Sequence, residues 1–184
     1  MTHPVATDQA EADLVPTDHA GAVGHQVTRY RACVVTVSDR VTSGVRADTT
    51  GPLLVRWLAG LGMDVAEPTV VSDDVAQVRD AVERQLAAGA RLVVTTGGTG
   101  IGPRDRTPEA LGPLFDLTLP GIGEAVRAAG DNPTACLSRA VAGVVGRSLV
   151  VALPGSVGAC QDAVRVLTPV VAHALDQLDG GDHT

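Results

Sequence analysis

Short runs of aliphatic residues alternate along the chain with longer segments whose apolar residues recur at helical spacing. These two periodicities predict strands over residues 30–37, 63–71, 91–96, 140–146 and 148–155, and helices over 51–62, 72–89, 106–111, 120–130 and 156–178. Such alternation favours a three-layer α/β fold, in which a mostly parallel sheet carries helices on both faces.

Several residues mark where these elements begin or end. Pro68 lacks a backbone N–H, so the segment 63–71 is expected at an edge of the sheet. Thr107 is the predicted N-cap of a helix that has Pro108 in its first position. Ser156 opens the last helix, which Pro169 is a candidate to interrupt.

The composition fits a buried sheet. Only three of the 184 residues are aromatic, so the core must be built from Val, Leu and Ala. Residues 28–180 are expected to form one domain. Cys33, Cys136 and Cys160 stand far apart among apolar neighbours, which predicts buried thiols rather than a disulfide or a zinc site.

Charge separates the first 27 residues from the rest. Residues 1–27 hold four acids, no Arg or Lys and no sustained periodicity, which predicts a disordered acidic tail. The formal net charge is −7 and no basic run occurs, so no nucleic-acid or anionic-membrane partner is expected. No apolar run reaches the length of a membrane span, and we expect a soluble, cytoplasmic protein.

Two residue types are missing from the centre of the chain. All fourteen basic residues are Arg, and positions 26–172 contain neither His nor Lys. This excludes a Ser-His-Asp or Cys-His pair, a Schiff-base lysine and a phosphate-loop lysine from that region. Its chemistry must use carboxylates, hydroxyls, backbone amides, Arg or a metal ion held by oxygen.

Polar loops follow the predicted strands. The loops begin with Ser38, Thr95 and Pro154, and a fourth begins near Ser72. In doubly wound sheets ligands bind beyond the carboxyl ends of the strands, where such loops converge. The loops therefore predict a pocket that contains no His.

The loop "TTGGTGIGPRD", residues 95–105, holds four glycines. Residues without Cβ let consecutive backbone amides reach an anion, and a helix N-terminus follows at Thr107, so one interpretation is a phosphate site. Neither the dinucleotide spacing nor a phosphate-loop lysine is present. A tight turn between strand and helix accounts for the glycines equally well, and the loop composition leaves both interpretations open.

Four motifs together resemble one known family. "VSDRVTSG", "TTGGTGIGPRDRTPEA", "LSR" and "LPGS" occur in the order and spacing of the MogA/MoaB family of molybdenum cofactor biosynthesis, to which the G domains of gephyrin and plant Cnx proteins also belong. The resemblance covers residues 30–178. It implies a molybdopterin-binding fold and an Mg²⁺-dependent adenylyltransferase that joins ATP to molybdopterin and releases pyrophosphate.

The resemblance also implies roles for individual residues. Asp105 and Asp73 are the implied catalytic acids and metal ligands, because Asp105 stands in "PRD" and Asp73 follows the second strand. Ser72 replaces the proline usual in the family, so either Asp73 or Asp74 is a candidate to face the pocket. The implied nucleotide site comprises Gly97, Gly98, Thr99, Gly100 and Asp105. The implied substrate site comprises Ser38, Asp39, Asp73, Thr107, Ser138, Arg139, Pro154, Gly155 and Ser156.

Two other functions stay open at this point. One is a catalytically silent MoaB-type paralogue that binds pterin or nucleotide, or that serves as an assembly partner. The other is a nucleotide-pyrophosphate hydrolase of the CinA type. The resemblance further implies a homotrimer or a dimer of trimers, with a molybdenum insertase as a possible partner.

Overall fold

The structure, a computed structural model, describes residues 30–181. The predicted tail 1–27 lies outside the described residues. The described strands are β1 (Arg31–Val37), β2 (Asp64–Val65), β3 (Thr69–Val71), β4 (Leu92–Thr96), β5 (Leu117–Thr118), β6 (Val141–Val145) and β7 (Ser148–Leu153). The α-helices are α1 (Asp39–Thr42), α2 (Thr50–Gly60), α3 (Val75–Ala87), α4 (Thr107–Leu111), α5 (Pro120–Ala128) and α6 (Val157–Leu178).

The strands form one sheet in the order β2-β1-β4-β7-β6-β5, and β3 pairs with the second half of β1. The pairs that β1 makes with β2, β3 and β4 are parallel, as is the pair of β4 with β7. This confirms the α/β fold. Strand β6 departs from the expected alternation, because it pairs antiparallel with both β5 and β7.

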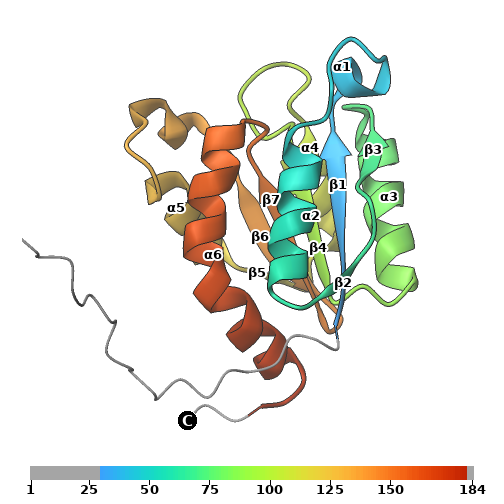
Figure 1. Cartoon of the computed structure of the whole chain (residues 1–184), viewed down its shortest axis with the longest axis vertical. Coiled ribbons are helices and arrows are strands. Elements are labelled where there is room, and N and C mark those ends of the chain that lie inside the picture. The colour runs from blue at the N-terminus through green and yellow to red at the C-terminus, as the bar shows by residue number, and fades with distance from the viewer. Residues whose placement is uncertain (1–29, 182–184) are drawn as a thin grey trace, which may run out of the picture.

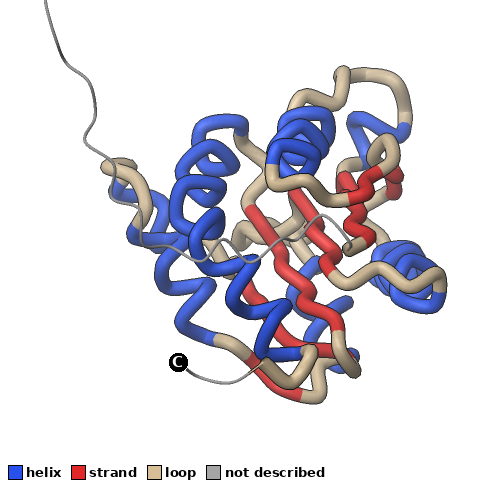
Figure 2. The backbone as a smooth tube through the Cα atoms, turned by 60° about the horizontal axis from the view of Figure 1, so that its bottom comes forward, coloured by secondary structure: helices blue, strands red, loops and turns tan. Residues whose placement is uncertain are grey.

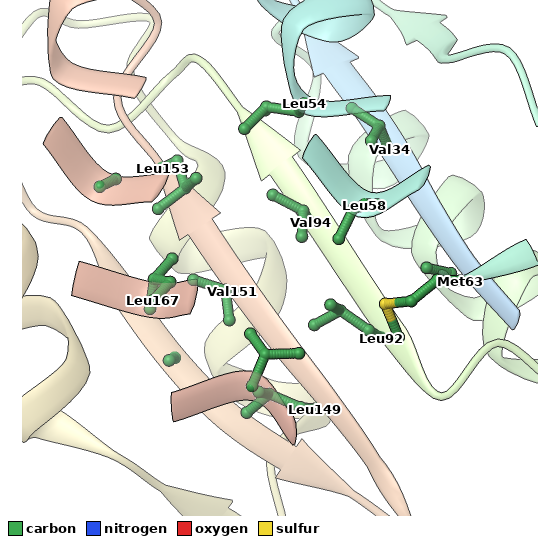
Figure 3. Close-up of a cluster of buried hydrophobic side chains, with 14 of the residues drawn as sticks. Val34, Leu54, Leu58, Met63, Leu92, Val94, Leu149, Val151, Leu153 and Leu167 are labelled. Atoms are coloured by element: carbon green, nitrogen blue, oxygen red, sulfur yellow. The ribbon is translucent and has the colours of Figure 1, made fainter. Parts of the chain in front are cut away.

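Helices cover both faces of the sheet (Figures 1 and 2). On one face α2, α5 and α6 pack on a core that includes Leu54, Leu58 and Leu167 (Figure 3). On the other face α3 and α4 cover Val35, Val93 and Val150. Each of these side chains is at most 2% exposed, and burying such a side chain contributes about 1.5–3 kcal/mol. The aliphatic core is therefore as the composition predicts.

Three local predictions need correction. Pro68 lies between two short strands rather than within one, although both lie at the expected edge of the sheet. Pro169 does not interrupt α6, since the exposed Pro169 lies between Leu167 and Val171, which are both buried against the sheet and hold the helix in place. Cys136 is exposed in a 3-10 helix, whereas Cys33 and Cys160 are buried as predicted. Burial raises the pKa of the Cys33 thiol to about 12.

Candidate functional site

The loops after β1, β3, β4 and β7 meet at one edge of the sheet, at the top of Figure 1. Backbone hydrogen bonds join them: Gly97 N donates to Leu153 O at 3.0 Å, and Ser38 N donates to Val71 O at 2.9 Å. Because β1, β3, β4 and β7 are all parallel to one another, their carboxyl ends point the same way and their loops converge.

Two cavities open at this edge. The larger, cavity 1, has a volume of about 590 Å³ and lies between the glycine loop, α5, the 3-10 helix 133–137 and the start of α6. The smaller, cavity 2, has a volume of about 210 Å³ and lies between the glycine loop, the loop after β1 and the start of α2. Gly98, Asp105 and Gly155 line both cavities. Ligands in the two cavities would therefore meet at one carboxylate.

The glycine loop has a conformation that glycine alone adopts easily. Gly97 and Gly98 have φ angles of +105° and +63°, where side chains with Cβ are strained. A Cβ at Gly97 would also collide with the carbonyl oxygen of Val37. The Gly97 amide donates to Leu153, whereas the N–H groups of Gly98, Thr99 and Gly100 have no protein acceptor among the described residues. Three amides of the loop are thus available to an anion.

Thr107 is not the N-cap of α4. The N-cap is Arg106, and α4 begins at Thr107 and spans only five residues. The buried Thr107 hydroxyl instead donates to Gly97 O at 2.8 Å, and Thr107 N donates to Gly98 O at 3.0 Å. Thr107 therefore fixes the glycine loop from behind, and it lines neither cavity.

The Asp105 carboxylate lies inside the glycine loop. Its Oδ2 accepts a hydrogen bond of 2.8 Å from Gly102 N. A Cβ built at Gly100 or Gly102 would lie 2.8 Å from that oxygen, closer than such atoms normally approach. Two of the glycines therefore make room for Asp105.

Asp73 and Asp39 bind each other's backbone. Asp73 Oδ2 accepts from Asp39 N at 3.0 Å, and Asp39 Oδ1 accepts from Asp73 N at 3.1 Å. Arg104 forms an ion pair with Asp39. Burial is the main cause of a raised pKa at Asp73; the charge of Asp39 adds to it, while the Asp39 amide and Arg104 oppose it. Asp73 lines cavity 2, and Asp39 lines neither cavity.

Asp74 has a different position from Asp73. It is the N-cap of α3, and its Oδ1 accepts from Gln77 N at 3.0 Å. Asp74 lines neither cavity. The Ser72 hydroxyl before this pair is buried and makes no hydrogen bond among the described residues.

Arg139 contacts the glycine loop instead of either cavity. Its Nε donates to Gly100 O at 2.8 Å, and its terminal nitrogens bind the Asp105 carbonyl oxygen and the Glu109 carboxylate. Arg139 N also donates to Thr99 O at 2.7 Å. The hydrogen bond from the Arg139 side chain holds the pKa of Glu109 below its usual value. Arg139 therefore holds the loop that carries Asp105.

The remaining implied site residues line one cavity or the other. Ser38 lines cavity 2, and Ser138, Pro154 and Ser156 line cavity 1. Ser138 lies 3.4 Å from the Thr99 hydroxyl, measured between the two Oγ atoms. Ser156 is the N-cap of α6 as predicted, and its Oγ accepts from Ala159 N at 3.3 Å.

Both cavities have walls that the sequence did not predict. Asp48 lines cavity 2, accepts a 2.7 Å hydrogen bond from Thr36 Oγ1 and binds Gly51 N at 2.9 Å at the start of α2. The surrounding sequence "DTTGP" contains residues that often cap helices, and it could have indicated that Asp48 caps α2. Asn132 and Asp162 line cavity 1, and no local motif marks either residue.

Within residues 30–181, no group of three or more His, Cys, Asp or Glu side chains is arranged to hold a metal ion. The carboxylates of Asp73 and Asp105 do share cavity 2. None of the helices in that part of the chain is long and apolar enough to cross a membrane.

The sequence and the fold match known proteins. Residues 33–173 match the family described as "Probable molybdopterin binding domain". The chain belongs to this family. Solved structures of a MogA and a MoaB protein, 41% and 39% identical to this chain, confirm the motif resemblance. Two curated relatives and a solved structure illustrate the similarity of this molybdopterin-binding domain to other members.

The "Molybdenum cofactor biosynthesis bifunctional protein" of Synechococcus elongatus is 44% identical over 83% of this chain, which spans about half (48%) of that protein. The "Molybdopterin adenylyltransferase" of Pyrococcus furiosus is 40% identical over 79% of this chain and 89% of its own. The structure of the molybdopterin biosynthesis Mog protein from Mycobacterium ulcerans superposes with a TM-score of 0.77 at 42% identity and covers 81% of this chain and 99% of that one.

Proposed function

We propose that this protein is a molybdopterin adenylyltransferase that uses ATP and Mg²⁺ in molybdenum cofactor biosynthesis. The observation that carries the proposal is that Gly98, Asp105 and Gly155 line both cavities, so two reactants can meet at one acidic group. Relatives from Pyrococcus furiosus and Helicobacter pylori, 40% and 34% identical, are named molybdopterin adenylyltransferases, which supports the same assignment.

Each cavity suits one of the two reactants. The larger cavity has Val126, Leu137 and Ala159 among its lining residues, and these apolar side chains suit a flat ring system such as a pterin. Ser38, Thr50 and Asp73 all line the smaller cavity, and their hydroxyls and carboxylate suit the phosphates of a nucleotide and a metal ion. We therefore assign the pterin to cavity 1 and the ATP phosphates to cavity 2.

The transfer joins the two ligands at the shared wall. An oxygen of the molybdopterin phosphate attacks the α-phosphorus of ATP, the bond from that phosphorus to the bridging oxygen breaks, and pyrophosphate leaves with the bonding pair. Negative charge builds on the phosphate oxygens during this step, and preorganised donors stabilise it. The amide of Gly98, which lines both cavities, and those of Thr99 and Gly100, which line cavity 1, are the donors that the protein offers near Asp105.

The donor set at cavity 2 also suits Mg²⁺. This ion usually takes one or two carboxylates together with substrate phosphates and water. Asp73 and Asp105 supply two such carboxylates, so these residues would hold the ion, which neutralises phosphate charge when bound. Asp39 orients Asp73 through the paired backbone contacts, and Gly102 orients Asp105.

The test is an adenylylation assay with purified full-length protein. With ATP, Mg²⁺ and molybdopterin, we expect equal amounts of adenylylated molybdopterin and pyrophosphate. Binding of both ligands without turnover would favour the silent paralogue, and cleavage of a nucleotide without pterin would favour the hydrolase. Either result would contradict the proposed transfer.

The assembly is a separate part of the proposal. We expect a homotrimer or a dimer of trimers, with a molybdenum insertase as the partner that receives the adenylylated product. The relatives named bifunctional, of which this chain spans 48% and 57%, are longer proteins, and their names support a second activity of the same pathway as the partner. Multi-angle light scattering at micromolar concentration tests the oligomer, and a monomeric mass would contradict it.

A further inference from the structure

Cavity 1 has an acidic group at some distance from the glycine loop. Asp162 lies on α6, six residues after the N-cap Ser156, and both residues line the cavity. Six helical residues span about 9 Å along the helix axis. Asp162 therefore lies well along α6 from the end of the helix that adjoins the glycine loop.

Arg165 and Gly130 contact the Asp162 carboxylate, and about a third (32%) of the Asp162 side chain is exposed. Arg165, one turn later on α6, forms an ion pair with its Oδ1. The other oxygen, Oδ2, lies against Gly130, where a Cβ would collide with it. Gly130 also lines cavity 1, so the glycine at this position leaves space for the carboxylate. Oδ2 has no hydrogen-bond donor among the described residues.

Two apolar residues share the cavity lining with this carboxylate, together with polar residues such as Arg127 and Asn132. Val126 is buried, and Ala159 lies one turn before Asp162 on α6, both in the cavity lining. A carboxylate beside such a wall is an acceptor that selects ligands with donors at the matching position.

The pyrimidinone edge of a pterin matches this acceptor. Its N3–H and its 2-amino group are two parallel donors, which a carboxylate can accept side by side. Adenine offers an acceptor, N1, beside its amino group, so it would place a lone pair against a carboxylate oxygen. The carboxylate thus favours a pterin over an adenine in this cavity.

We propose that Asp162 is a specificity-determining residue that binds the N3–H and 2-amino group of the pterin. This inference rests on the proposed function, which assigns the pterin to cavity 1. Contact at Asp162 orients the ring with its amino edge away from the glycine loop. The phosphate-bearing side of the substrate then faces Asp105, where the transfer takes place.

The experiment compares two ring systems on the full chain. 6-Hydroxymethylpterin carries the 2-amino donor, whereas 6-hydroxymethyl-lumazine has an oxo acceptor at the same place. We expect fluorescence titration of the wild-type protein to show pterin binding about ten- to a hundredfold more tightly, the size of one hydrogen bond to a charged group. Equal affinity for the two, or no binding of either, would overturn the proposal.

Substitution at Asp162 tests the residue directly. Asp162→Asn keeps one acceptor and places a donor beside it, so the preference for pterin should disappear or reverse toward lumazine. Asp131→Asn is the matched control, since it removes a neighbouring charge outside the cavity lining and should keep the wild-type preference. An Asp162→Asn protein with the wild-type preference would overturn the proposal.

Circular dichroism shows whether Asp162→Asn folds, and a second variant tests the proposal if it does not. Gly130→Ala keeps the charge but adds the Cβ that displaces Oδ2, so it too should lose the preference. The adenylylation assay, run in parallel, separates the two proposals. Transfer without pterin preference would overturn the role of Asp162 alone, whereas pterin preference without transfer would overturn the proposed function alone.

Discussion

At the residue scale, the glycines of the loop after β4 accommodate the protein's own atoms and leave the amides of Gly98, Thr99 and Gly100 without a protein acceptor among the described residues. Gly97 and Gly98 have positive φ angles, and Gly98 leaves no room for a Cβ beside the Thr107 hydroxyl. The two interpretations of this loop, a tight turn and an anion site, are therefore compatible. A substitution such as Gly98→Val would strain the backbone, so its loss of binding could not be separated from a loss of stability.

Arg139 offers a cleaner test of the loop. Arg139→Lys keeps the charge but cannot bind Gly100 O, Asp105 O and Glu109 together, because Lys lacks the planar fork. We expect a kcat lowered by about tenfold, as for loss of roughly 1.4 kcal/mol, with the KM for molybdopterin nearly unchanged. The measurement is steady-state adenylylation.

Arg106→Lys is the control for this prediction. Arg106 also pairs with Glu109, at 4.0 Å, but more than half of its side chain is exposed and it lines neither cavity. This variant should keep wild-type kcat. Equal kcat values for the two variants would show that Arg139 does not position Asp105.

At the element scale, the sequence predicted the helices, strands and loops that depend on local residue patterns. Hydrophobic periodicity located the long helices and the buried strands, and the polar loops after β1, β4 and β7 were expected at one edge because parallel strands end together. The antiparallel direction of β6 was not predicted, because a hairpin turn at Gly146 replaces a crossover helix. The prediction of Thr107 as a cap was wrong because its side chain binds a distant carbonyl, which is a tertiary contact.

A residue in the first turn of α6 affects both the stability of the helix and the lining of cavity 1. Gly158 lies in this turn, lines cavity 1, and has open space where a Cβ would be. Gly158→Ala should raise the melting temperature by about 2–4 °C, because alanine is roughly 1 kcal/mol more favourable than glycine in a helix. The added methyl group should also raise the KM for molybdopterin. Differential scanning calorimetry and steady-state kinetics measure the two effects, and a lower melting temperature with unchanged KM would contradict both.

At the scale of the whole molecule, Asp179 joins segments that are distant in sequence. It follows α6 and accepts hydrogen bonds from Tyr30 Oη at 2.5 Å and from Arg147 at 2.6 Å, while Arg91 forms an ion pair with it at 2.8 Å. The Tyr30 hydroxyl is the main cause of a lowered pKa at Asp179, and the two arginines add to it. These contacts hold together the end of the domain that lies opposite the candidate site.

The lowered pKa gives a pH-dependent prediction. A carboxylate whose folded pKa is depressed stabilises the fold above its unfolded pKa, about 3.9, and loses that contribution as pH falls through the folded value. Asp179→Asn should therefore melt about 2–4 °C below wild type at pH 7, and the gap should narrow below about pH 4. Thermal melts across pH 3–7 measure the gap, with the exposed Asp80→Asn as control. A gap that is constant across this range would contradict the assigned charge interaction.

The candidate site was predictable only in its central part. The motifs named the glycine loop, Asp73 and Asp105, and all of these line the cavities. Asn132 and Asp162 come from segments whose local sequence carries no binding motif, and only packing brings them to a cavity wall. The sequence around Asp48 indicates a helix cap but not a place in a cavity wall. Asp39, Thr107 and Arg139 were expected to touch substrate; their side chains contact neighbouring protein groups and they line neither cavity.

The central claim is that Asp105, at the wall shared by both cavities, takes part in adenylyl transfer. The most direct measurement is the initial rate of adenylylated molybdopterin formation by Asp105→Asn at saturating ATP, Mg²⁺ and molybdopterin. Asp74→Asn is the matched control, because Asn also serves as an N-cap and Asp74 lies outside both cavities. We predict a rate lowered by about 10²–10³ for Asp105→Asn and a wild-type rate for Asp74→Asn, with both proteins folded by circular dichroism. A folded Asp105→Asn protein with the wild-type rate would contradict the account.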